Sequence, residues 1–266
     1  MRAQYARCDA AIADAIHDLK IYGHTVDTGR WQGISTAGKP DLKTKEILDL
    51  RFAVDLKRGS WFSDNEESVY AAEIATEIQP SLPWADEHFE ERVGGVPRNP
   101  DPSHTHWPWW HGQDAETKAD EKFTHTYSER FWPPETMGIR YPFGDYEDVI
   151  ELLASEPYTR QAYLPIFFPE DTGAVHRGRI PCSLGYHFLL RGHELHCWYS
   201  IRSCDALRHF RDDLYLAVRL VAHTLSVLFE RELGSMNDQV WVDVNPGKLY
   251  FTAHSFHVHM GDYYNL

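Results

Sequence analysis

The sequence predicts an α+β fold, in which a mixed or antiparallel sheet packs with helices in one domain of 266 residues. Strand-like segments with alternating polarity are mixed with helical segments whose apolar residues recur three and four positions apart. They do not follow the regular β-α-β order of a parallel sheet. A content of 42% hydrophobic and 14% aromatic residues is typical of a globular chain.

Periodicity and helix-breaking residues place the individual elements. Leu195, Cys197, Tyr199 and Ile201 alternate with polar residues, which predicts a strand with one buried face. Pro80 ends one helical segment. We expect helices at residues 5–20, 68–79, 145–156 and 212–231, and strands within 21–56 and at 160–168, 184–190, 195–202, 240–244 and 249–258.

Residues 97–134 differ from the rest of the chain. They are rich in proline, tryptophan and histidine and show little periodicity. A long segment of this kind is typical of an insertion or a lid. We therefore expect a single domain over residues 1–266 with an aromatic- and histidine-rich insertion or lid at 97–134.

Charge and hydrophobicity exclude some partners. The chain holds 26 Lys and Arg against 40 Asp and Glu, a net charge of −14, which disfavours binding to duplex nucleic acid. The longest apolar stretch, Leu214 to Phe229, contains Arg219 and His223, so it predicts no membrane span. The N-terminus shows no secretory signal, and we expect a cytoplasmic protein.

The four cysteines show no CxxC pair and no disulfide framework, which favours reduced thiols. Cys182 follows Pro181 at the start of a predicted strand, with Arg177 and Arg179 close in sequence, so a thiolate is one interpretation. A small buried residue is the other. Similarly, Arg202 beside a serine predicts either an anion site or a surface salt bridge.

The pair Pro181-Cys182, followed about twenty residues later by Arg202-Ser203-Cys204-Asp205, resembles the thymidylate synthase family. That resemblance implies a nucleophile at Cys182 and a phosphate site at Arg202 and Ser203. For the phosphate, it further implies a binding loop at Arg30 and an arginine lent to a partner's site at Arg160. For the base, it implies a helix glutamate facing the ring at Glu73 and an active-site tyrosine at Tyr141. It also implies a pterin contact at Asp205 and sugar contacts at His257 and at His259, which stands where the family has tyrosine.

One departure from that family concerns the base. The run Phe210-Arg211-Asp212-Asp213 is similar to the corresponding run of phage deoxycytidylate hydroxymethylases, and uracil-specific synthases have asparagine where Asp213 stands. A carboxyl group suits the amino group and unprotonated ring nitrogen of cytosine. The resemblance therefore favours dCMP or CMP over dUMP. An alternative is that one of the two aspartates only caps a helix.

The reaction implied is transfer of a one-carbon unit from 5,10-methylenetetrahydrofolate to carbon 5 of a pyrimidine nucleoside monophosphate in a homodimer. Cys182, Glu73 and Asp213 would be its catalytic residues. The 5-hydroxymethyl product is favoured; a 5-methyl product and a non-catalytic nucleotide-binding role stay open. Metal binding by His104, His106 and His111, or by His254, His257 and His259, is a rival interpretation, although we predict no metal.

Overall fold

A computed structural model describes residues 3–31, 34–57, 66–109, 122–133, 145–172, 180–233 and 239–266. Tyr141, Arg177 and Arg179 lie outside these ranges. Within them, no helix combines the length and hydropathy needed to cross a membrane.

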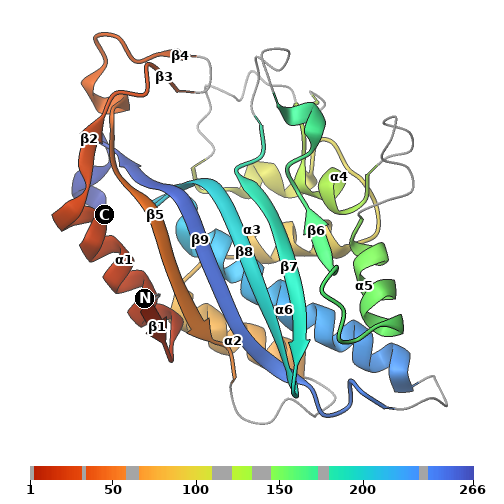
Figure 1. Cartoon of the computed structure of the whole chain (residues 1–266). Helices are drawn as coiled ribbons and strands as arrows, with labels where there is room; N and C mark the ends of the chain where they lie inside the picture. Colours follow the sequence, from red (N-terminus) through yellow and green to blue (C-terminus); the bar gives the residue numbers. More distant parts are fainter. Residues whose placement is uncertain are drawn as a thin grey trace.

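A mixed sheet forms the centre of the molecule (Figure 1). Its strands lie in the order β1-β5-β9-β8-β7-β6, and β2 pairs with the edge of β5. The pairs β1–β5 and β8–β9 are parallel and the others are antiparallel. The strands are β1 (Ala3–Tyr5), β2 (His24–Val26), β5 (Thr44–Asp55), β6 (Tyr163–Pro165), β7 (Ser183–Arg191), β8 (Glu194–Asp205) and β9 (Asn245–His259), with a separate small pair of β3 (Arg30–Trp31) and β4 (Ile34–Ser35).

Helices cover one face of this sheet, and the longest, α6, passes behind the central strands (Figure 1). Local signals explain several helix starts: Asp145 caps α5, and Thr126 with Glu129 forms a capping box on α4. The helices are α1 (Cys8–Tyr22), α2 (Glu66–Ile78), α3 (Trp84–Val93), α4 (Tyr127–Phe131), α5 (Tyr146–Ser155) and α6 (Phe210–Leu233), with short 3-10 turns at Pro40–Leu42, Pro102–His106, Pro169–Asp171 and Tyr263–Asn265.

The predicted α+β class is confirmed, and so is the two-faced character of β8. Leu195, Cys197, Tyr199 and Ile201 are fully buried against the helices, while the alternate residues of that strand are partly exposed. On the opposite face, Trp198 stacks on Tyr250 of β9 with ring centroids 4.2 Å apart. An aromatic pair therefore lies on the open face of the two central strands β8 and β9.

Two elements differ from the prediction. The sequence analysis did not anticipate α3, because its ten residues are mostly polar and follow Pro80 and Pro83 closely. Residues 240–244 form a turn instead of a strand, and the strand predicted at 249–258 is longer than expected, since β9 begins at Asn245 and ends at His259. Glu232 of α6 explains the turn, since its carboxylate accepts hydrogen bonds from the backbone N–H groups of residues 240–242.

The described parts of residues 97–134 pack into the domain. Asp101 and Ser103 are buried beside α3, and Phe131 of α4 belongs to the hydrophobic core. This proline-rich segment therefore supplies one wall of the interior.

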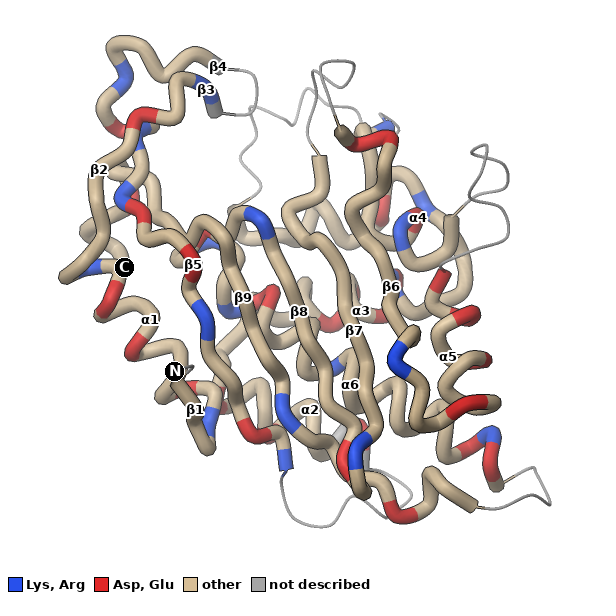
Figure 2. The backbone as a smooth tube through the Cα atoms, viewed as in Figure 1, with Lys and Arg blue, Asp and Glu red and all other residues tan. Residues whose placement is uncertain are grey.

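Lys and Arg residues are scattered among acidic ones in the view of Figure 2 and form no continuous band there. A phosphorylated ligand would have to be bound by a few local cations.

Candidate active site

Three strand ends meet at one edge of the sheet, the upper edge in Figure 1. Cys182 immediately precedes β7, and the antiparallel pairing brings it beside β8, where the Arg202 N–H donates to the Cys182 carbonyl at 2.8 Å. The parallel pairing of β8 with β9 sets Asp205 opposite His257. Sheet register thus gathers residues that are up to 75 positions apart in the sequence.

Cys182 is the only partly exposed cysteine; Cys8, Cys197 and Cys204 are buried. Burial raises the pKa of Cys197 and of Cys204, which keeps those thiols protonated. The Arg202 guanidinium lies 3.9 Å from the Cys182 sulfur. A neighbouring cation stabilises a thiolate, so this sulfur is the candidate nucleophile.

Arg202 itself is held by the chain that leads into β7. Its Nε donates to the Pro181 carbonyl at 2.8 Å, and its Nη2 donates to the Ile180 carbonyl at 3.0 Å. These bonds fix the guanidinium next to the sulfur and leave Nη1 for an anionic ligand. Ser203, the next residue, is partly exposed on β8.

The two aspartates at the start of α6, Asp212 and Asp213, make different contacts. Asp212 accepts hydrogen bonds from the backbone and hydroxyl of Ser81, so it anchors the loop before α3. Asp213 is buried and its Oδ2 lies 3.8 Å from the Cys204 sulfur. Burial raises the pKa of Asp213 to about 7, while the positive charge of Arg92 acts in the opposite direction. Only Asp213 is thus a candidate for contacting a base.

Three further residues reach this region from helices: His88 and Arg92 of α3, and Tyr127 of α4. The Arg92 guanidinium lies 4.0 Å from the centre of the Tyr127 ring, and the Tyr127 hydroxyl is 3.1 Å from the Ser183 hydroxyl. Ser183 directly follows Cys182. The sequence analysis missed all three, and the capping box Thr126-x-x-Glu129 was the one available signal for α4.

The sequence matches no family model and no curated protein. Solved structures do match. The thermostable thymidylate synthase A from Bacillus subtilis superposes with a TM-score of 0.61 at 12% identity, over 97% of this chain and 81% of that one. The thymidylate synthase from T4 phage has a TM-score of 0.55 at 15% identity, over 93% and 75% of the two chains.

The chain has the thymidylate synthase fold.

Within the thymidylate synthase fold, three residues predicted for the site lie apart from the Cys182 cluster. Glu73 is exposed on α2, which lies nearer the β7–β8 turn than the Cys182 edge (Figure 1), so α3 instead provides the helix beside the pocket. Arg30 is exposed on β3, and Arg160 is exposed just before β6. Arg160 was predicted to serve a partner's site, for which an exposed position is suitable. Tyr141 falls outside the described residues, and the hydroxyls of Tyr127 and Tyr199 lie beside that of Ser183, at 3.1 and 2.7 Å.

His257 and His259 lie together with Asp205 at the same edge of the sheet as Cys182. One ligand atom from each lies within 4.8 Å of the others, and a carboxylate with two imidazoles could hold a divalent cation. Asp205 Oδ1 already accepts the N–H groups of Leu207 and Arg208 at 3.0 Å each. Burial lowers the pKa of His257, which favours the neutral ring. A neutral imidazole and a carboxylate also suit the hydroxyls of a sugar or the N–H groups of a pterin.

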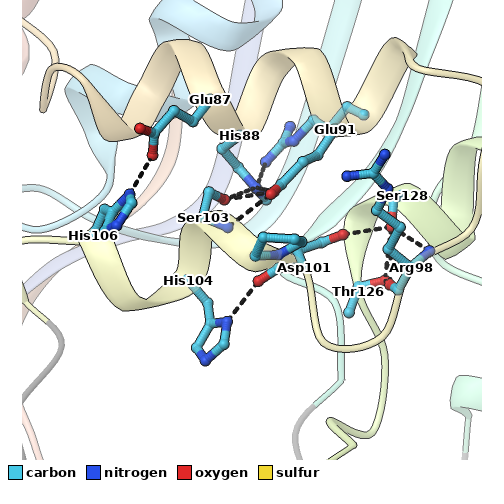
Figure 3. Close-up of polar contacts among 12 residues, drawn as sticks. Glu87, His88, Glu91, Arg98, Asp101, Ser103, His104, His106, Thr126 and Ser128 are labelled. Atoms are coloured by element: carbon cyan, nitrogen blue, oxygen red, sulfur yellow. Dashed lines mark hydrogen bonds and ion pairs between the residues drawn. The ribbon is translucent and has the colours of Figure 1, made fainter. Parts of the chain in front are cut away.

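The other predicted histidine group is not assembled as a metal centre in the described part of the chain. His106 bonds Glu87 at 2.6 Å, and His104 bonds the Asp101 carbonyl at 2.5 Å (Figure 3). His111 lies outside the described ranges, and His254 is exposed on β9. The His106 contact ties the 97–109 segment to Glu87 of α3, and the His104 contact is made within the segment.

Proposed function

We propose that this protein transfers a one-carbon unit to carbon 5 of a pyrimidine nucleoside monophosphate, with dCMP or CMP as substrate and the 5-hydroxymethyl nucleotide as product. The observation that carries the proposal is the placement of one partly exposed thiol, Cys182, beside the Arg202 guanidinium. The buried carboxyl of Asp213 belongs to the same region, because Cys182 and Asp213 both act electrostatically on Tyr127. A protein that only bound nucleotides would have no use for that thiol.

The role of Cys182 follows from pyrimidine chemistry. Its sulfur forms a bond to carbon 6, and the ring electron pair moves to carbon 5, which becomes the nucleophile. After the one-carbon unit is attached, carbon 5 loses its proton and the bond from the new carbon to its carrier amine breaks, which leaves an exocyclic methylene while Cys182 stays bonded to carbon 6. Water added to that methylene gives the hydroxymethyl group, and departure of the Cys182 sulfur then restores the ring double bond.

The remaining residues bind and orient the nucleotide. Asp213 would accept a hydrogen bond from the exocyclic amino group of cytosine. Arg202 and Ser203, with Arg30 and a partner's Arg160, would bind the phosphate, and His257 and His259 the sugar. These assignments rest on the resemblance together with the positions of Arg202, Ser203 and the two histidines at one sheet edge.

The site also has features that suit a folate. Asp205 accepts two backbone N–H groups at Oδ1, and no hydrogen bond to its Oδ2 is made by the residues that the structure describes. Four residues after Asp205, His209 stacks on Trp107 with ring centroids 4.7 Å apart, which provides a flat aromatic surface. Asp205 would bind the pterin N–H groups. When bound, 5,10-methylenetetrahydrofolate supplies the one-carbon unit and, if the product is methyl, the hydride as well.

We also propose a homodimer formed through the open face of the sheet. Trp198, Tyr250 and the 73% exposed Leu48 lie on or beside that face, and a hollow of about 580 Å³ follows its β5 edge. Aromatic and aliphatic surface of this kind is stabilised when a second copy covers it. Trp198→Glu should convert the protein to a monomer in sedimentation experiments. An unchanged dimer would contradict this placement of the interface.

Mass spectrometry of products tests the reaction. The protein is incubated with 5,10-methylenetetrahydrofolate and, separately, dCMP, CMP or dUMP. A gain of CH2O on a cytosine nucleotide supports the proposal and identifies the sugar. A gain of CH2 would instead indicate a methyltransferase. Absence of any product, with nucleotide binding equal in wild type and Cys182→Ala, would favour a binding-only role.

A further inference from the structure

The guanidinium of Arg92 is a charged group near Asp213, and its positive charge acts on that carboxyl. This side chain is 3% exposed. Its Nη2 contacts His88 Nε2 at 3.0 Å, and its Nη1 reaches the Tyr186 hydroxyl at a long 3.5 Å. Its Nε is buried and has no hydrogen-bond acceptor among the residues that the structure describes. A buried donor without an acceptor is costly, and a ligand that supplies the acceptor removes that cost.

A chain of polar contacts through His88 holds this guanidinium in place, and Figure 3 shows its members His88, Glu91 and Ser103. His88 Nδ1 lies 3.5 Å from Glu91 Oε2, and Ser103 donates its N–H and its hydroxyl to the same carboxylate at 2.7 and 2.5 Å. Because Nε2 of His88 accepts from a guanidinium, its proton is on Nδ1 and the ring is neutral. Burial lowers the pKa of His88 to about 4, which maintains this state at neutral pH. Arg92 is therefore a fixed cation.

Aromatic residues place Arg92 and Asp213 side by side. Tyr186 and Tyr199 stack in parallel with centroids 4.6 Å apart; Arg92 donates to the first hydroxyl, and the second bonds Asp213. On the other side, Arg92 covers the Tyr127 ring, whose hydroxyl points to Ser183 and so towards the nucleophile. Guanidinium, carboxyl and thiol are therefore linked through Tyr127, on which Cys182, Asp213 and Arg92 all act electrostatically.

This pair matches one pyrimidine edge. From position 4 to position 2, cytosine presents an amino donor, a ring-nitrogen acceptor and a carbonyl acceptor, whereas uracil presents an acceptor, a donor and an acceptor. A carboxylate can accept from the amino group while an adjacent guanidinium donates to the ring nitrogen. The same pair would set its acceptor against the uracil carbonyl and its donor against the uracil N–H.

We infer that Arg92 is a base-recognition residue, which donates to ring N3 of a cytosine nucleotide while Asp213 accepts from the amino group. The inference rests on the proposed function, because it takes the ligand to be a pyrimidine nucleotide. It adds a specificity residue on α3, so that Arg92 of α3 and Asp213 of α6 would each bind the base.

Calorimetric titration with dCMP, CMP and dUMP, in the absence of folate, tests this role. Arg92→Met removes the donors and keeps much of the volume. We expect it to weaken binding of the cytosine nucleotide by roughly 10-fold or more, and dUMP binding by clearly less, so that the ratio of the two dissociation constants falls. Arg92→Lys keeps the charge without the planar fork and should give an intermediate ratio. It also provides the test if the methionine variant does not fold.

The matched control is Arg130→Met. Arg130 is similarly buried and lies over the Phe168 ring, but both of its terminal nitrogens are paired with Asp171, at 3.0 and 2.9 Å. This variant should lose stability and keep the wild-type base ratio. The inference would be overturned, and the proposed function left standing, if Arg92→Met and Arg92→Lys weakened binding of all three nucleotides equally or weakened none of them. A wild type that binds none of the nucleotides would overturn the proposed function as well.

Discussion

The pocket has two sides that are built differently. The strand side (Cys182, Arg202, Asp205 and His257) is placed by the register of three adjacent strands, and most of its polar contacts are to backbone groups. The helix side (His88, Arg92 and Tyr127) comes from short helices and is placed by side chains bonded to side chains.

This difference affects how each side responds to substitution. Backbone-anchored groups keep their positions when one neighbour changes, because the strands are held by many ladder hydrogen bonds. A side-chain network loses its geometry when a single member is removed, since a buried polar atom is then left unsatisfied. We therefore expect strand-side variants to change chemistry with little loss of stability, and helix-side variants to change both.

The largest effect is expected on the strand side. Cys182→Ser should reduce product formation by at least about 1,000-fold, because a serine hydroxyl is a far weaker nucleophile than a thiolate at neutral pH. Nucleotide affinity and the urea midpoint should stay close to wild type. The matched control is Cys8→Ala, which removes a buried thiol of α1 remote from the pocket and should retain activity. Substantial turnover by the serine variant would contradict the proposed mechanism.

Asp213 lies where the two sides meet, and its effect depends on pH. Its pKa is raised to about 7, so the folded state holds the proton more tightly than the unfolded chain does, and this group lowers the free energy of unfolding as pH rises from about 4 to about 7. Asp213→Asn should therefore be more stable than wild type at pH 8, by on the order of a few kcal/mol, with a smaller difference at pH 5.

Urea unfolding of both proteins across this range provides the measurement. Part of the slope should remain in the variant, because burial also raises the pKa of Asp101, to about 6. Parallel stability curves for Asp213→Asn and wild type would show that folding does not raise the pKa of this carboxyl.

The smallest effect concerns the contact that joins the two sides. Tyr127→Phe removes the hydroxyl that bonds Ser183 and should lower the free energy of unfolding by about 1 kcal/mol. Tyr163→Phe is the control: its hydroxyl makes a long 3.4 Å bond on a residue that is 45% exposed, so its loss should change stability by less than about 0.5 kcal/mol. Equal losses from the two changes would mean that the bond between the sides is unimportant.

The sequence predicted the strand side far better than the helix side. Alternation in β8 identified its buried face, and a short motif around Cys182 and Arg202 marked residues that the structure places together. Such signals are local: a strand face needs only a period of two, and a hairpin brings neighbouring segments together. The same reasoning wrongly predicted a strand at 240–244, because the turn there is held by Glu232 from another element.

The helix side could not be predicted because a buried charge and a surface charge look alike in a sequence. Residues His88, Glu91 and Arg92 have the composition of a solvated helix face, and only the packing of the 97–109 segment and α4 against α3 encloses them. Glu73, on a more regular helix, was the natural choice for a group facing the base, yet it is exposed.

The order of the two sides along the chain has a consequence for synthesis. The helix side ends with α4 at Phe131, whereas Tyr186, Tyr199 and Asp213, which complete the surroundings of Arg92, come later in the chain, so Arg92 is synthesised well before its surroundings are complete. The nascent helix α3 must keep this side chain hydrated until β7, β8 and α6 arrive. Pulse-labelling hydrogen exchange during refolding should then show α3 gaining protection after the β8–β9 pair, and earlier protection would contradict this order.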